Sequence, residues 1–207
     1  MYAMNTRETN IKTRAHDLFQ LADQQAGYFS AGQANTIGYS GRLHHYHRQQ
    51  GHWLEVHRGL FRLRDYPVTP DEELVKFSLW SRNLKGQPQA VVSHETALRV
   101  YDLSDLMPSK IHLSVPKTFR KTPPKGVVLH KALLEPNDIE ARAGFQITTP
   151  LRTLIDLAKG QVSPEHLETA TQQALERGLV RRKKLEAALT ELDMMARNRL
   201  EQALRTL

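Results

Sequence analysis

Side chains able to read a DNA duplex are concentrated in one short segment. Arg42, His44, His45 and Arg48 fall between two glycine-containing turns. Arginine can bind guanine through two hydrogen bonds or pair with a phosphate, and neutral histidine can donate or accept one hydrogen bond. If the segment is a helix, its exposed side presents these groups to the bases in the major groove.

Further phosphate contacts are expected on both sides of this segment. Ser40 and the free backbone amide of Gly41 would stand at the helix start, where backbone N–H groups bind phosphate. Arg58 at the tip of an expected hairpin and Arg62 on its return strand suit the DNA backbone or the minor groove. We include Ser30, the cap of the preceding helix, among these DNA-binding candidates.

The charge of this region supports the same interpretation. Residues 38–64 contain five arginines and a single acid, Glu55, so they carry +4 of the chain's net charge of +7. Neutralisation of phosphates by such residues dominates non-specific affinity for DNA. Charge alone fits equally well a small domain that arginines keep soluble, so the order of the surrounding elements has to decide.

Histidines crowd the same region, and two of them, His44 and His47, are three residues apart and could share a metal ion. No carboxylate or further histidine follows at a ligand spacing, so we expect no metal site. If His44 or His45 contacts a phosphate, affinity for DNA should rise as the pH falls through about 6.5.

A second set of basic residues marks the C-terminal half. They could extend the DNA footprint, bind RNA or contact an acidic protein, or complement the C-terminus of a helix. One group lies in a proline-containing loop and the other where one helix ends and the next begins: Lys117, Arg120, Lys121 and Lys125; Arg181, Arg182, Lys183 and Lys184.

Catalysis is not indicated. The sequence has no glycine-rich phosphate loop and no His-Glu-x-x-His motif. Ser93, His94 and Glu95 are neighbours in sequence, whereas catalytic triads converge in space. Asp102 and Asp105 can cap a turn or, with Glu95, bind a metal. The absence of cysteine excludes disulfides and thiolate chemistry. We expect no catalytic residue, no cofactor, no metal and no enzymatic activity.

The elements expected around the arginine-rich segment have the order of a winged helix-turn-helix. A helix with an apolar stripe (Ala15, Leu18, Phe19, Ala22) ends at Gly27. A capping box at residues 30–33 opens a short second helix, Gly38 makes a turn, and a third helix covers residues 41–50. Residues 53–56 and 60–63 then form a tight hairpin.

The remaining chain mixes helices and strands. Thr149-Pro150 and Ser163-Pro164 have the form of helix starts, and Arg152 and Asp156 can pair across one helical turn. The expected fold class is α+β: an N-terminal winged helix-turn-helix at residues 1–66, a linker at 67–74, and a mixed α/β domain at 75–207 that ends in helices. Expected elements are helices at 72–80, 93–101, 150–159, 164–178 and 182–207, the last with a possible break near 192–194, and strands at 111–115, 127–130 and 145–148.

Composition narrows the class of protein. The 207 residues are 40% hydrophobic and 25% charged, which is a globular balance. The positive charge favours an anionic partner: nucleic acid, an acidic membrane face or an acidic protein. No apolar run approaches the roughly 18 residues of a membrane span, and residues 1–12 lack the apolar core of a signal peptide. We expect a soluble, cytoplasmic protein.

Several segments together resemble the AbiEi family of antitoxins. In the N-terminal part they are GYFSAGQA (27–34), GYS (38–40), Leu43 and GHWLEVHRGLFRL (51–63). Further on they are VSHETAL (92–98), IHLSVP (111–116) and TTPLRTLIDL (148–157). The resemblance covers about residues 13–190 and depends on the order of these segments more than on any one of them.

This resemblance implies a bacterial antitoxin of a type IV toxin–antitoxin system, paired with a nucleotidyltransferase-like toxin. It implies a winged helix that binds inverted repeats in its own promoter and represses transcription. It also implies a C-terminal domain that neutralises the toxin without necessarily forming a stable complex with it. The histidine-rich helix departs from the arginine, serine and threonine of the family, which affects the operator sequence rather than the groove-binding role.

Two other functions remain open. The chain could be a stand-alone winged-helix regulator whose C-terminal domain senses a ligand or oligomerises. It could also be a nucleic-acid enzyme that uses its basic C-terminal surface.

Overall fold

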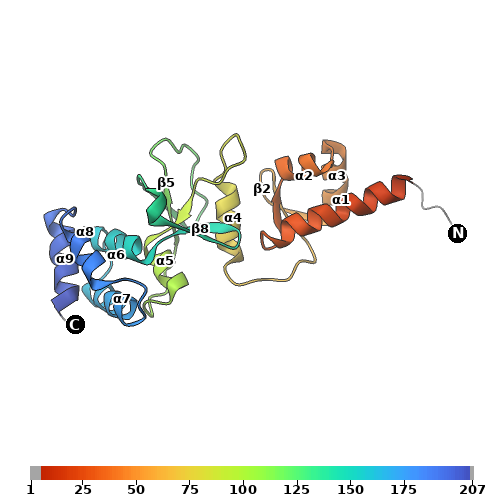
Figure 1. Cartoon of the computed structure of the whole chain (residues 1–207). Coiled ribbons are helices and arrows are strands. Elements are labelled where there is room, and N and C mark those ends of the chain that lie inside the picture. The colour runs from red at the N-terminus through yellow and green to blue at the C-terminus, as the bar shows by residue number, and fades with distance from the viewer. Residues whose placement is uncertain (1–5, 206–207) are drawn as a thin grey trace. The chain divides into compact units, whose positions relative to one another are not determined.

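The computed structural model describes the backbone of residues 6–205 and the side chains of residues 11–205 (Figure 1). The α+β class predicted from the sequence is confirmed. The chain divides into two compact units, residues 1–88 with 143–145 and residues 89–142 with 146–207. This division falls C-terminal to the linker expected at 67–74. The sequence predicted no signal peptide in residues 1–12, and the first five of these residues lie outside the part of the chain that the structure describes.

The first unit has the element order expected for a winged helix-turn-helix. Helix α1 is followed by strand β1, helices α2 and α3, and the β2–β3 hairpin. The strands form an antiparallel sheet in the order β1-β3-β2, and helix α4 completes the unit. The bounds are α1 Thr6–Asp23, β1 Tyr28–Ser30, α2 Ala31–Ile37, α3 Gly41–Gln49, β2 Trp53–His57, β3 Leu60–Leu63 and α4 Glu72–Trp80.

Apolar burial explains why these elements pack together. Leu18 and Ala22 of α1 are buried against Phe29, Trp53 and Phe61 of the sheet in one cluster. The Phe29 and Trp53 rings meet edge to face at 4.8 Å. The other half of the predicted α1 stripe, Ala15 and Phe19, is exposed, so that stripe is only half correct.

Local sequence signals define the turn between α2 and α3. The predicted capping box is confirmed, because the Ser30 side chain accepts from the Gln33 backbone N–H and the Gln33 side chain accepts from the Ser30 backbone N–H. Helix α2 ends at Gly38, whose φ of 102° lies in the region that favours glycine. This turn fixes the direction in which α3 leaves α2.

The second unit is built on a five-stranded mixed sheet with the order β6-β5-β4-β8-β7. Strand β5 pairs with β6 in parallel and with β4 antiparallel, and β4 pairs with β8 in parallel. The strands are β4 Val91–Val92, β5 Ile111–Val115, β6 Val127–Lys131, β7 Ile139–Arg142 and β8 Phe145–Thr148, with a 3-10 turn at Pro136–Asp138.

In Figure 1 the helices of this unit gather mostly at one side of the sheet. The predicted caps are confirmed: Thr149 accepts from the Arg152 backbone N–H, and Ser163 from that of His166. No helix of residues 6–205 is long and apolar enough to cross a membrane. The bounds are α5 His94–Tyr101, α6 Pro150–Lys159, α7 Pro164–Glu176, α8 Arg182–Leu189 and α9 Met194–Arg205.

One arginine of α9 closes the C-terminal end of α6. The Arg199 guanidinium donates to the carbonyl oxygens of Leu157, Ala158, Gly160 and Val162. The last carbonyls of a helix have no partner within the helix, so a side chain that binds them stabilises its end. Helix α9 therefore holds both α6 and the loop that follows it.

Candidate nucleic-acid interface

Helix α3 presents a polar, exposed face. Arg42, His45 and Arg48 are exposed on it, as the sequence predicted, and no residue of α3 is fully buried. Ser40 occupies the N-cap position and is exposed, and within residues 6–205 its side chain makes no capping hydrogen bond. The Ser40 hydroxyl and the Gly41 amide thus stand at the start of a helix, the place where anions bind.

The opposite face of α3 packs on the aromatic core. Leu43 lies against the core cluster, and the His47 ring stacks on Trp53 with centroids 4.7 Å apart and planes 12° apart. His44 also turns inward, with its ring 5.4 Å from Trp53 and 5.8 Å from Phe61. His44 is half-buried, and this packing directs its ring towards the core, unlike the exposed side chains of Arg42 and His45.

The β2–β3 hairpin carries the second expected contact. Arg58 is exposed at its tip, next to Gly59, whose φ of 64° makes the tight turn. Arg48 of α3 reaches Glu55 of β2 at 2.7 Å, and the two side chains are 47% and 30% exposed. A surface pair of this kind stabilises the fold little. Arg48 therefore remains available to a phosphate that competes with Glu55.

Two residues predicted to contact DNA, Arg62 and Ser30, are buried and bonded within the fold. Arg62 is only 8% exposed. It donates to the Pro67 carbonyl at 3.1 Å and to the Glu72 carboxylate at 3.0 Å, so it joins β3 to α4. Ser30 is 5% exposed and its oxygen caps α2. Neither residue can meet DNA without giving up these bonds.

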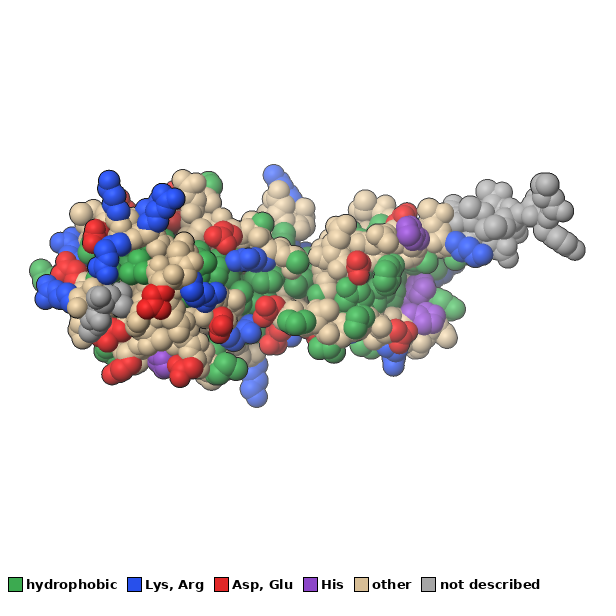
Figure 2. Space-filling view, turned by 60° about the horizontal axis from the view of Figure 1, so that its bottom comes forward, with side chains coloured by type: hydrophobic (Ala, Val, Ile, Leu, Met, Phe, Trp, Pro, Cys, Tyr) green, Lys and Arg blue, Asp and Glu red, His purple; other side chains and the backbone are tan. Residues whose placement is uncertain are grey.

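The basic residues predicted in the C-terminal half are all exposed on the second unit. Lys and Arg side chains project from several parts of its surface (Figure 2). Residues 181–184 precede and open α8, and the other group belongs to the loop between β5 and β6. The exposed residues are Lys117, Arg120, Lys121, Lys125, Arg181, Arg182, Lys183 and Lys184.

The TTPLRTLID segment takes part in a partly buried ion-pair network. Arg152 pairs with Asp156 at 2.8 Å, as its spacing predicted, and also with Asp138 at 2.6 Å. Asp156 is 5% exposed, and burial raises the pKa of its carboxyl while the Arg152 hydrogen bond opposes that shift. The network joins the start of α6 to the turn before β7, which is a structural role.

The sheet brings together three histidines that the sequence analysis did not connect. In the parallel β5–β6 pair His112 lies opposite Val128 and Ser114 opposite His130, so His112 and His130 share a face. Their Nδ1 and Nε2 atoms are 3.1 Å apart. The His94 ring stacks on His130 with centroids 3.6 Å apart. The cluster could have been found from the sequence only by predicting the register in which β5 pairs with β6.

The surroundings of the histidine cluster keep its three imidazoles uncharged. Burial, followed by the neighbouring imidazoles, lowers the pKa of His94 to about 3 and that of His130 to about 4. Burial also lowers the pKa of His112, which Glu95 opposes from 3.5 Å. The His94 backbone has a φ of 53°, which is rare for a histidine, and the Ser93 hydroxyl lies 2.9 Å from its Nδ1.

These rings face a cavity of about 270 Å³ that Glu95, Leu157 and Val162 also line. No group of three His, Asp or Glu side chains in residues 11–205 is arranged to hold a metal ion. The stacked rings of His94 and His130 explain this for the histidine cluster, because a metal must lie in the plane of each imidazole that binds it. Neutral imidazoles at such a cavity can donate and accept hydrogen bonds.

Comparison with solved structures agrees with this architecture. The chain is similar to the crystal structure of the RV2827C protein from Mycobacterium tuberculosis, with a TM-score of 0.60 and 13% sequence identity. The similarity covers 94% of this chain and 76% of that chain, and at this identity it concerns the fold alone. No protein of curated function matches the chain.

The fold and the exposed basic face define a two-unit α+β protein with a helix-turn-helix and hairpin ahead of a mixed-sheet unit. The second unit identifies the family. The model of the AbiEi antitoxin C-terminal domain matches residues 90–206, more than half of the chain, and the chain belongs to the AbiEi antitoxin family. Membership supports the role of an antitoxin in a toxin–antitoxin pair.

Proposed function

We propose that this antitoxin represses its own promoter by sequence-specific DNA binding through its first unit. Helix α3 enters the major groove, where Arg42 and His45 contact base edges. Ser40, Gly41, Arg48 and the hairpin Arg58 hold phosphates or the minor groove. The observation that carries this proposal is the two-sided α3: its inner face is fixed on Trp53, and its outer face is basic and exposed.

The charge distribution supports the proposal. The outer face of α3 and the hairpin tip carry three exposed arginines, Arg42, Arg48 and Arg58, and Glu55 is the acid paired with one of them. A helix N-terminus with a free serine hydroxyl adds a further phosphate ligand. This arrangement places cations at two positions that a duplex backbone can contact at once.

A mobility-shift titration on the DNA upstream of the gene tests this proposal. Arg42→Ala and Arg58→Ala should each weaken binding, and the loss of a phosphate contact should lower the salt dependence by about one ion. Lys85→Ala is the matched control, because Lys85 is exposed in the same unit but lies in the loop after α4. If both arginine variants bind like the wild type at physiological salt, the interface lies elsewhere.

We further propose that the second unit neutralises a nucleotidyltransferase-like toxin. The family match lies in this unit, and its exposed basic residues offer a surface for an acidic protein or for a nucleic acid that the toxin uses. Co-expression with a neighbouring nucleotidyltransferase-like gene tests the pairing. Unrelieved growth arrest in the presence of folded antitoxin would contradict it.

A further inference from the structure

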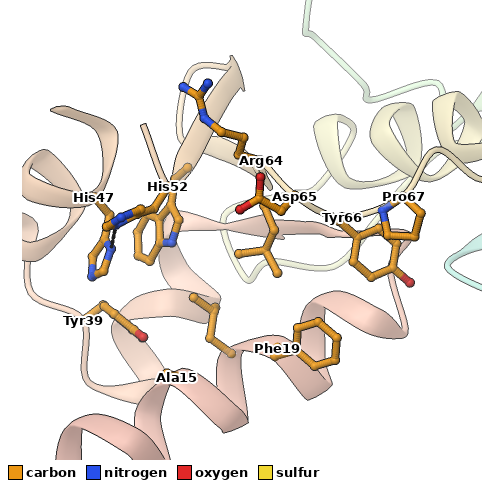
Figure 3. A pocket seen from close by; sticks show the side chains of 12 residues that line it. Ala15, Phe19, Tyr39, His47, His52, Arg64, Asp65, Tyr66 and Pro67 are labelled. Carbon is orange, nitrogen blue, oxygen red and sulfur yellow. Dashed lines mark hydrogen bonds between the residues drawn. The ribbon is translucent and has the colours of Figure 1, made fainter. Parts of the chain in front are cut away.

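A cavity of about 340 Å³ lies within the first unit, behind α3 (Figure 3). Its walls come from α1, the last turn of α3 with the turns before and after that helix, strands β2 and β3, and the segment after β3. The volume falls within the roughly 300–1,000 Å³ typical of small-molecule sites. The exposed residues of α3 proposed to meet DNA do not line it, so a ligand could occupy it while DNA is bound.

Half of the residues that line this cavity carry aromatic rings. Phe19 and Tyr66 stand at one side with ring centroids 6.4 Å apart, and Tyr39, His47 and Trp53 stand at the other (Figure 3). In the space-filling view, hydrophobic side chains gather on this unit with histidines beside them (Figure 2). Aromatic rings on two sides of the cavity favour a flat occupant, because stacked and edge-to-face contacts add to the burial of apolar area.

The polar edge of the cavity carries no net charge. Its two formal charges, on Arg64 and Asp65, are opposite. His47 and His52 approach each other at 3.2 Å between their Nδ1 atoms, so one of these nitrogens donates to the other. Burial, then the neighbouring His52, lowers the pKa of His47. The edge therefore offers hydrogen bonds without favouring an anion or a cation.

We propose that this cavity binds a flat, neutral aromatic heterocycle of one or two fused rings. The rings of the ligand lie between the Phe19–Tyr66 side and the Tyr39–Trp53 side, and a ring nitrogen or oxygen meets the His47–His52 edge. Leu18 and Leu63 form the apolar lining. An apolar body with one fixed polar contact is the usual composition of a small-molecule site.

The chain's two tryptophans provide the test, because Trp53 lines the cavity and Trp80 does not. Their side-chain N–H signals are followed by ¹H–¹⁵N NMR of the full chain during titration with quinoline. The Trp53 signal should shift to saturation and the Trp80 signal should stay in place. Cyclohexanol, which is not flat, and benzoate, which is charged, should bind about tenfold more weakly or less.

Results of three kinds would overturn the site. These are a Trp53 signal that does not move with quinoline, a Trp80 signal that follows the same curve, and equal binding of cyclohexanol or benzoate. A filled cavity is the positive control: Ala15→Phe, at an exposed position on the cavity wall, should weaken quinoline binding about tenfold or more. Gln20→Phe adds the same ring on α1 away from the wall and should leave binding unchanged.

The same cavity offers a route for a ligand to act on promoter binding, an expectation that rests on the proposed function. His47 belongs to α3 and Tyr39 to the turn before it, so a ligand in the cavity contacts the helix that is proposed to read DNA. Saturating quinoline should change the promoter Kd about fivefold or more in the wild type and not in Ala15→Phe. An unchanged Kd with a shifted Trp53 signal would overturn the coupling alone.

Discussion

At the scale of single residues, the arginines of this protein divide into those that hold the fold and those that face solvent. Arg62 is buried and Arg152 is half-buried beside carboxylates, whereas Arg42, Arg58 and Arg142 are exposed. Sequence alone does not separate these classes, because a buried arginine and an exposed one differ only in what packs around them. Their replacements should therefore have very different effects.

Arg152→Met should be severely destabilising. It removes the partner of the 5% exposed Asp156 and leaves that carboxylate buried. Losing one partner of a buried pair costs about 3–5 kcal/mol. Arg142→Ala, which breaks a pair with Glu140 in which both side chains are more than 40% exposed, should cost about 0–1 kcal/mol. Urea unfolding of both variants measures the difference, and similar midpoints would contradict the structural role of Arg152.

Arg62→Ala and Arg58→Ala should separate folding from DNA binding. Arg62→Ala leaves Glu72 and the Pro67 carbonyl without their donor, at a cost of about 1–3 kcal/mol. Arg58→Ala removes an exposed side chain and should change stability by less than about 0.5 kcal/mol while weakening promoter binding. Thermal unfolding and mobility shifts on the same preparations give both quantities. A stable Arg62→Ala protein with weak DNA binding would restore Arg62 to the interface.

At the scale of elements, local signals predicted helix starts well and the directions of side chains less well. The caps at Ser30, Thr149 and Ser163 depend on residues within one turn, so the sequence contains all that they need. The inward turn of His44 depends on Trp53 and Phe61 in another element. Strands β1, β4 and β7 were missed because they are only three, two and four residues long.

Ser30→Ala should test the assignment of this side chain to the α2 cap. Loss of an N-cap oxygen costs about 1 kcal/mol, so the melting temperature should fall. Promoter affinity, measured well below the melting temperature, should stay at the wild-type value because Ser30 is 5% exposed. A large loss of affinity with an unchanged melting temperature would mean that the hydroxyl reaches DNA.

The histidine cluster at the α5 start and on β5 and β6 should make the protein sensitive to acid. The folded pKa values of His94 (about 3) and His130 (about 4) lie below the ordinary value of 6.5. At pH values between 6.5 and these lower pKa values, the unfolded chain binds protons that the folded chain does not. The stability present above pH 6.5 is therefore lost as the pH falls. Glu95 faces His112, and Arg152 and Lys110 act on the cluster from neighbouring elements.

Urea unfolding at pH 7, 6 and 5 measures this loss. The free energy of unfolding should fall by about 1 kcal/mol or more per pH unit below pH 6. His130→Phe should make the dependence shallower, whereas His45→Phe, at an exposed position, should leave it unchanged. Equal slopes in the wild type and His130→Phe would show that the cluster is not the source of the dependence.

At the scale of the whole molecule, the two compact units allow the two proposed activities, DNA binding and toxin neutralisation, to be tested separately. The interface proposed for DNA lies within residues 1–88, and the family match lies within residues 90–206. The sequence analysis expected two domains because each half of the chain carries its own run of motifs. The unit boundary at residue 88 was not predicted, since α4 joins the first unit through the Arg62–Glu72 pair rather than through any local signal.

Replacing residues 181–184 by glutamine should therefore impair neutralisation of the toxin and leave promoter binding intact. These exposed cations belong to the second unit, while Arg42→Ala in the first should do the reverse. Growth of cells that express the toxin gives one readout and a mobility shift gives the other. If both variants lose both activities, the two units do not act separately.

The hydrogen bonds from Arg199 to the carbonyls at the end of α6 have a consequence for the synthesis of the protein. Because Arg199 follows the carbonyls that it binds by 37 to 42 residues in the sequence, α6 and its loop acquire these bonds only after the chain has been made as far as Arg199. Nascent chains that stall before this point would lack these bonds, and the end of their α6 would be less stable.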